Sequence, residues 1–217
     1  DRLWKPSITT GRWSVKASTL TVAKKHLMQD AKLQKIILEV GKFQPVPVSS
    51  ENYYHVLACS IISQMISTKA ASSIQRKLLE RLKSEFITPG AILKLKPEEI
   101  RKVGLSLSKV SALQALAEQV RNQTIAVEKF GSMENKEIVQ ELTQIKGIGP
   151  WTAQMFLIFG LVRPDVWPEA DLGLRMAVQK LDDLLQVPDI AYVRQRGLPF
   201  APYRTVACWY LWQSLKL

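Results

Sequence analysis

Apolar residues recur along most of the chain at the three- and four-residue spacing of a helix. One such run lies between residues 19 and 40, where Thr19 or Thr21 is suited to cap a helix and Gly41 to end it. We expect further helices over about 50–65, from near Ser67, and over 71–86, 97–103, 108–122, 134–142 and 172–181. No segment alternates with the period of a strand, and none repeats. The pattern therefore predicts an all-α protein.

A glycine turn between two of these apolar runs is the most informative feature of the sequence. It reads Lys146-Gly147-Ile148-Gly149-Pro150. Both glycines tolerate positive φ and lack a Cβ, so they allow a tight turn and a close approach by another molecule, and the proline suits the first turn of a helix. The amides at this helix start are expected to bind an anion. The alternative is a turn that only joins two helices.

Composition and charge narrow the class of protein. The 217 residues are 47% hydrophobic and 23% charged, which provides a full core and excludes a disordered chain. The net charge is +11, with no run of five like charges. This favours a polyanionic partner such as nucleic acid, and the alternative is a basic protein without one.

The two cysteines, Cys59 and Cys208, lie far apart within apolar runs. They are expected to be reduced core thiols of an intracellular protein, and they are too few for an iron–sulfur cluster. No stretch of about 18 apolar residues and no signal-peptide pattern occurs, so we expect neither a membrane span nor secretion. A first residue of Asp1 indicates a trimmed chain.

The segment from Leu142 to Gln154 resembles the helix-hairpin-helix of DNA glycosylases. Within that superfamily the pattern G-I-G-x-W-T-A, followed twenty residues after Trp151 by Asp171, is most similar to the 3-methyladenine DNA glycosylase II group. The resemblance implies a two-lobed all-α fold with the active site in the cleft between lobes. Residues 49–160 would form a central lobe ending in the helix-hairpin-helix at about 136–160, and residues 1–48 and 161–217 would form the other, after a rigid Pro45 and Pro47 link.

The resemblance also implies residues that contact double-stranded DNA. The hairpin residues expected to hold phosphate are Lys146, Gly147, Gly149 and Thr152. Met65 would be the wedge that fills the gap left by an extruded base, and Gln64 would contact the orphaned partner base. The alternative, which does not use the family resemblance, is that Met65 is a core methionine at a helix end.

Ser108 and Lys109 form a further candidate contact. They are expected to open a helix with a cap and a positive charge, and their amides would reach a phosphate. The alternative is a plain helix cap.

Asp171 is the expected catalytic residue. A carboxylate at a helix N-terminus is stabilised in its ionised form, and a negative charge stabilises the oxocarbenium character that a sugar acquires as its base leaves. The simpler role of Asp171 as an N-cap is compatible with this. Glu169 is the second candidate.

The base must be flipped into a pocket for this chemistry, and the family implies aromatic walls at Trp151 and Trp212. Met155 and Leu172 stand where some relatives have aromatic residues, which leaves the pocket more open. Bifunctional relatives carry a lysine in place of Trp151, and a Schiff base needs an amine. A monofunctional enzyme is therefore expected.

The expected function is hydrolytic excision of alkylated purines, 3-methyladenine and also 7-methylguanine, in base excision repair. The alternatives are a glycosylase for deaminated or oxidised bases and a non-catalytic DNA-binding module. The family implies no catalytic cofactor, although a structural monovalent cation on the carbonyls of Thr143, Ile145 and Ile148 is expected. We expect a monomer acting on damaged double-stranded DNA in a nucleoid, cytoplasm or nucleus.

Arg204 is expected to hold the Asp171 region or the DNA backbone, or to form an ion pair with Asp165, Glu169 or Asp182.

Overall fold

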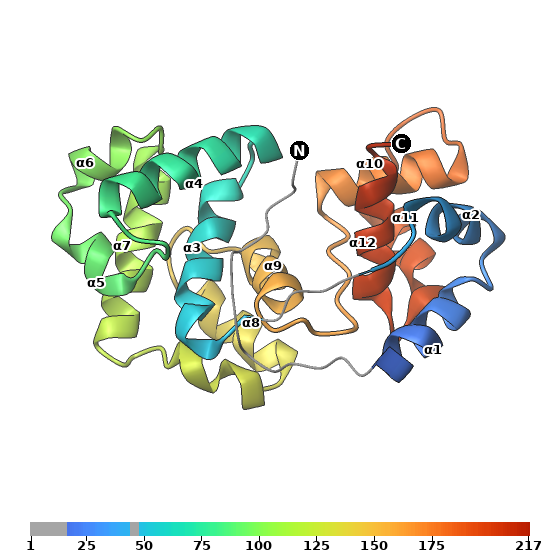
Figure 1. Ribbon diagram of the computed structural model, residues 1–217, viewed down its shortest axis with the longest axis horizontal. Coiled ribbons are helices and arrows are strands. Elements are labelled where there is room, and N and C mark those ends of the chain that lie inside the picture. The colour runs from blue at the N-terminus through green and yellow to red at the C-terminus, as the bar shows by residue number, and fades with distance from the viewer. Residues whose placement is uncertain (1–16, 44–47) are drawn as a thin grey trace. The chain divides into compact units, whose positions relative to one another are not determined.

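A computed structural model describes residues 17–43 and 48–217, and this part of the chain is helical and contains no strand (Figure 1). The all-α prediction is confirmed. The chain divides into two compact units, of which the first contains Val48–Leu161 and the second contains Val162–Leu217 together with 17–43. Residues 1–18 show no helical period and are expected to form an extended arm, and 1–16 of them lie outside the described residues, as does the Pro45 and Pro47 link.

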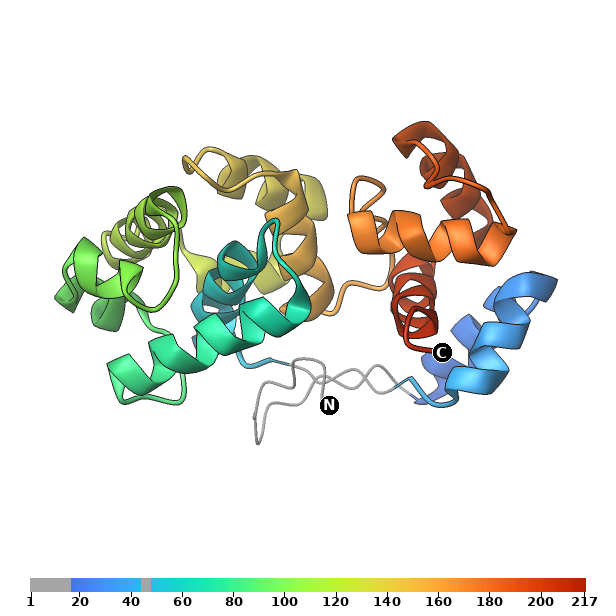
Figure 2. The ribbon, with the colours of Figure 1, turned by 90° about the horizontal axis from the view of Figure 1, so that it is seen from above.

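The first unit is built around one apolar helix, α3. Its residues from Tyr53 to Ile62 are all buried, because α4, α7 and α9 pack against it (Figure 2). The helices of this unit are α3 (Tyr53–Ser63), α4 (Thr68–Leu82), α5 (Pro89–Lys94), α6 (Pro97–Arg101), α7 (Leu107–Arg121), α8 (Asn135–Thr143) and α9 (Pro150–Phe159). Short 3₁₀ turns lie at Ser50–Asn52 and Val127–Ser132. The unit thus presents the loop after α3 and the turn between α8 and α9 from rigid helices.

The second unit joins the first helices of the chain to its last. Its helices are α1 (Ala17–Leu27), α2 (Ala31–Val40), α10 (Leu172–Asp182), α11 (Ile190–Gly197) and α12 (Arg204–Ser214), with a 3₁₀ turn at Leu198–Phe200. Helix α12 packs against α2 and α10. Tyr210 on α12 is fully buried, and its hydroxyl donates to the carbonyl of Gly41 at 3.0 Å. This packing fixes the position of α10, the helix that Asp171 begins.

Several helix predictions were wrong in detail, and the helices expected from near Ser67 and over 71–86 are the single helix α4, which ends at Leu82. The expected single helix over residues 19–40 is α1 and α2, because the Asp30 carboxylate accepts from the amides of Lys32 and Leu33 and starts a new helix. Neither Thr19 nor Thr21 is a cap, since α1 begins at Ala17, while Gly41 ends α2 as expected. The proline and glycine of Thr88-Pro89-Gly90 predict a break after the helix expected over 71–86, but Thr88 caps α5 and Pro89 begins it.

Cys59 and Cys208 are both buried thiols outside any disulfide, which confirms that they lie in the core. Among the described residues, no helix combines the length and the apolar character needed to span a membrane.

Candidate functional site

Asp171 is the N-cap of α10 and holds its carboxylate in a fixed orientation. Its Oδ1 accepts from the amide of Leu174 at 2.7 Å and from the indole Nε1 of Trp212 at 3.0 Å. The residue is half-buried, so the carboxylate is not sealed in the core. Two donors on one oxygen restrict rotation of the group, which is the condition for aiming a carboxylate at a reacting atom.

Gly173 makes room for this pair, and sequence reasoning missed it. A Cβ at Gly173 would lie 3.1 Å from Asp171 Oδ1 and 3.4 Å from Trp212 Cδ1 and Nε1. Glycine inside a helix costs roughly 1 kcal/mol relative to alanine. A glycine two residues after the candidate carboxylate, in the first turn of a helix, was the available signal.

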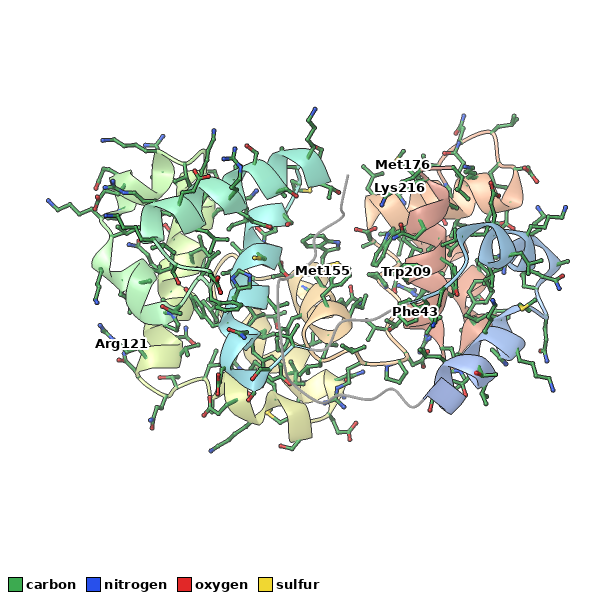
Figure 3. The ribbon with its side chains drawn as sticks, viewed as in Figure 1. Phe43, Arg121, Met155, Met176, Trp209 and Lys216 are labelled. Atoms are coloured by element: carbon green, nitrogen blue, oxygen red, sulfur yellow. The ribbon has the colours of Figure 1, made fainter. Side chains whose placement is uncertain are left out.

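The four predicted pocket residues fall into two sets. Trp212 contacts Asp171 through its indole. Leu172 directly follows Asp171 in the sequence, begins α10 and is 60% exposed. Trp151 and Met155 lie on α9 of the first unit, where Trp151 is half-buried and Met155, labelled in Figure 3, is buried. The structure therefore joins Trp212 to the carboxylate, and the pocket role of the other residues stays a prediction.

Two ion pairs hold the charged residues near Asp171 in sequence. Glu169 accepts from Arg194 at 3.2 Å. Arg204 donates to both oxygens of Asp165 at 2.6 and 2.7 Å, so the ion-pair alternative for Arg204 is the observed one. Partial burial alone would raise the pKa of Asp165, but the hydrogen bonds from Arg204 outweigh it and lower that pKa. These residues anchor the segment that leads to Asp171.

The hairpin between α8 and α9 has the expected glycine turn, with one correction. Gly147 has φ +92°, and a Cβ there would lie 2.8 Å from the Cβ of Ala112. Gly149 has φ −100° and ψ 176°, an extended conformation open to any residue, and its Cβ would meet nothing within 4 Å. Only Gly147 is therefore required by the fold. Pro150 begins α9, as predicted.

Some of the hairpin amides, though not all, are available to bind an anion. Ile148 donates its amide to the carbonyl of Ile145 at 3.0 Å. The amides of Lys146, Gly147 and Gly149 donate to no other group in the described part of the chain. Lys146 and Gly147 are exposed. Amides without a partner beside a helix N-terminus are the groups that a phosphate site needs, and phosphate binding here stays a prediction.

The loop after α3 presents an apolar side chain and is tied to this hairpin. Met65 is fully exposed with φ +54°, which contradicts the alternative of a core methionine. The Nε2 of Gln64 donates to the carbonyl of Gly147 at 2.9 Å and to Thr152 Oγ1 at 2.8 Å. Thr152 is 1% exposed, so its side chain serves this contact instead of facing a ligand. The hairpin and the Met65 loop thus form one structural feature.

The prediction that Ser108 caps the helix was wrong, while the phosphate contact of Ser108 and Lys109 stays a prediction. Helix α7 starts at Leu107, and its cap is Ser106, whose Oγ accepts from the amide of Lys109 at 3.3 Å. The Lys109 ammonium donates to the carbonyls of Ile62 and Gln64 at 2.8 and 2.7 Å. Because serine two residues earlier satisfies the same helix start, spacing alone could not identify the cap.

Within the ranges that the structure describes, no three His, Cys, Asp or Glu side chains gather in a group able to hold a metal ion. The second unit presents the fixed carboxylate of Asp171 at the start of α10. The first unit, taken by itself, presents the hairpin and the exposed Met65 loop.

Comparison with known proteins gives a consistent result. A family model described as "HhH-GPD superfamily base excision DNA repair protein" matches residues 58–196. DNA-3-methyladenine glycosylase 1 of Schizosaccharomyces pombe is 36% identical over 208 residues, covering 92% of this chain and 90% of that protein. The DNA-3-methyladenine glycosylase of Saccharomyces cerevisiae is 39% identical over 143 residues, covering 62% of this chain and 48% of that protein. The solved structure of the S. pombe 3-methyladenine DNA glycosylase in complex with abasic DNA is similar with a TM-score of 0.86 and 34% identity, over 90% of this chain and 97% of that one.

Proposed function

The chain belongs to the HhH-GPD superfamily of base excision DNA repair proteins, and we propose that it excises alkylated purines from double-stranded DNA by hydrolysis of the N-glycosidic bond. The substrates proposed are 3-methyladenine and 7-methylguanine. The observation that carries the proposal is the Asp171 carboxylate, held by Leu174 and Trp212 at the start of α10. The protein would act as a monomer wherever the cell keeps its DNA.

Asp171 supplies the charge that the reaction needs. As the bond to the base breaks, the sugar acquires oxocarbenium character, and a carboxylate beside C1′ stabilises that state and orients the attacking water. Because two donors already hold Oδ1, no further conformational entropy of the carboxylate has to be lost when the transition state forms.

The proposed substrate explains why a carboxylate and water suffice. A purine alkylated at N3 or N7 carries a positive charge, so it leaves without a general acid and is attracted to an aromatic face. No catalytic cofactor is required for this step. A monovalent cation on the carbonyls of Thr143, Ile145 and Ile148 would be structural, and Ile145 uses its carbonyl to accept from Ile148 as well.

The product is proposed to be an intact abasic strand. Lyase activity needs an amine nucleophile, and the chain has Trp151 at the position where bifunctional relatives have lysine. Lys146, the nearest lysine, is exposed on the other side of the turn. Borohydride trapping should therefore capture no protein–DNA adduct, and a trapped adduct would contradict this part of the proposal.

DNA binding is proposed for the hairpin and the Met65 loop. The amides of Lys146, Gly147 and Gly149 would hold backbone phosphate, which provides affinity without sequence information and makes binding sensitive to salt. Met65 would enter the stack as a wedge. Gln64 commits its N–H groups to the hairpin, so its Oε1 is the atom left to accept from a base.

The test is release of bases from alkylated DNA by the wild-type chain and by Asp171→Asn. The amide keeps the shape and loses the charge, and we expect the rate to fall by at least about a hundredfold, in line with the loss of one electrostatic stabiliser. Glu169→Gln is the matched control, because Glu169 is a carboxylate two residues away that is paired with Arg194. Equal rates for Asp171→Asn and the wild type would refute the enzymatic proposal, and a panel of duplexes with deaminated or oxidised bases separates the alternative substrates.

A further inference from the structure

Three segments that are distant in sequence meet at the start of α7. The Lys109 ammonium binds the carbonyls of Ile62 and Gln64 at the end of α3. The Gln64 side chain binds the hairpin at Gly147 and Thr152. One helical turn after Lys109, Ala112 lies against Gly147 and leaves no room for a Cβ there. Helix α7 therefore supports the Met65 loop and the hairpin at the same time.

Lysine is suited to this position for an electrostatic reason. The last carbonyls of a helix have no partner within the helix and carry partial negative charge. The Lys109 ammonium donates to two carbonyls at the end of α3, while partial burial lowers the pKa of the amine. A side chain of similar length without donors would leave both carbonyls without this partner.

The loop held in this way contains strained backbone. Met65 is a non-glycine residue with φ +54°, and its side chain is fully exposed. A left-handed conformation of a non-glycine residue is strained, and it persists when surrounding contacts enforce it. The contacts that enforce it here surround Met65 directly: the Gln64 carbonyl is held by Lys109, and the Gln64 side chain by the hairpin.

We propose that Lys109 is a positioning residue that holds the Met65 loop and, through Gln64, joins it to the hairpin. The part that binds the DNA backbone and the part that opens the base stack are thereby kept at a fixed distance from each other. This rests on the proposed glycosylase function. It assigns Lys109 no contact with the reacting atoms. The consequence is a specific defect in base extrusion when the lysine is lost.

The test compares Lys109→Met, Lys109→Arg and Arg121→Met. Methionine keeps the length and removes the donors, arginine restores them, and Arg121 is an exposed cation at the opposite end of α7 (Figure 3). Each protein is given one alkylated purine either in a duplex or in an unpaired bulge, where less stacking has to be broken. A 2-aminopurine beside the lesion reports unstacking by its fluorescence, and thermal melting reports folding.

For Lys109→Met we expect about a tenfold loss of single-turnover excision in the duplex, a clearly smaller loss in the bulge, and a weaker fluorescence rise at saturating protein. Lys109→Arg should recover most of the rate, and Arg121→Met should behave as wild type. Equal losses in duplex and bulge, or no loss, would overturn the inference. A wild-type chain that unstacks the duplex and releases no base would refute the proposed function, and the fluorescence of the variants would still decide the role of Lys109.

Discussion

Trp212 donates its indole N–H to Oδ1 of Asp171 at 3.0 Å, and so the last helix of the chain orients the carboxylate at the start of α10. The family resemblance predicts Trp212 as a wall of the base pocket. The hydrogen bond gives the residue a second role, because the same side chain can present its ring to a ligand and its N–H to the carboxylate.

We predict that Trp212→Phe lowers kcat for base excision by about tenfold, the effect of losing one hydrogen bond to a charged group. The aromatic ring is retained, so binding of the damaged base should change less. Single-turnover rates and KM separate the two effects. Trp209→Phe is the control, since Trp209 lies on the same helix and packs edge-on against Phe43 at 5.0 Å (Figure 3). A rise in KM with unchanged kcat would show that the indole N–H is dispensable.

The sequence predicts the helices, the glycine turn before Pro150 and the position of Asp171 at a helix start, because these depend on neighbours along the chain. Periodicity locates the apolar faces, and the glycine–proline turn fixes the start of α9. The misplaced helix starts depend on which nearby side chain caps the backbone, as Asp30 and Ser106 do. The contacts of Lys109 and Gln64, by contrast, are distant in sequence. Lys109 is bound by carbonyls 45 and 47 residues earlier, and Gln64 by a hairpin 83 residues later, so their roles follow from the tertiary fold.

Stability should depend on pH through His55, which lies outside the proposed site. The residue is buried, its Nδ1 accepts from the amide of Ile87 at 3.0 Å, and burial lowers its pKa from 6.5 to about 4. Between pH 6.5 and about pH 4 His55 is protonated in the unfolded chain and neutral in the folded chain. The free energy of unfolding therefore falls as the pH is lowered through this window. The loss is up to about 3 kcal/mol, at 1.36 kcal/mol for each pKa unit.

Urea unfolding of the wild type and of His55→Gln at pH 7 and 4.5 measures this contribution. Glutamine keeps an acceptor for Ile87 and does not titrate, so we expect the variant to be less stable at pH 7 and to lose less stability on acidification. Other groups titrate equally in both proteins and cancel in the difference. The same pH dependence in both proteins would rule out His55 as the cause.

The two hairpin glycines should respond differently to alanine. At Gly147 a Cβ would lie 2.8 Å from the Cβ of Ala112, and φ is +92°, so Gly147→Ala should destabilise the chain by about 1–3 kcal/mol. At Gly149 φ is −100° and a Cβ would meet nothing within 4 Å, so Gly149→Ala should fold at least as well as the wild type. If Gly149 serves the approach of a phosphate, its variant should bind DNA several-fold more weakly. Chemical unfolding and DNA titrations at two salt concentrations separate the two effects, and unchanged affinity in Gly149→Ala would remove that glycine from the phosphate site.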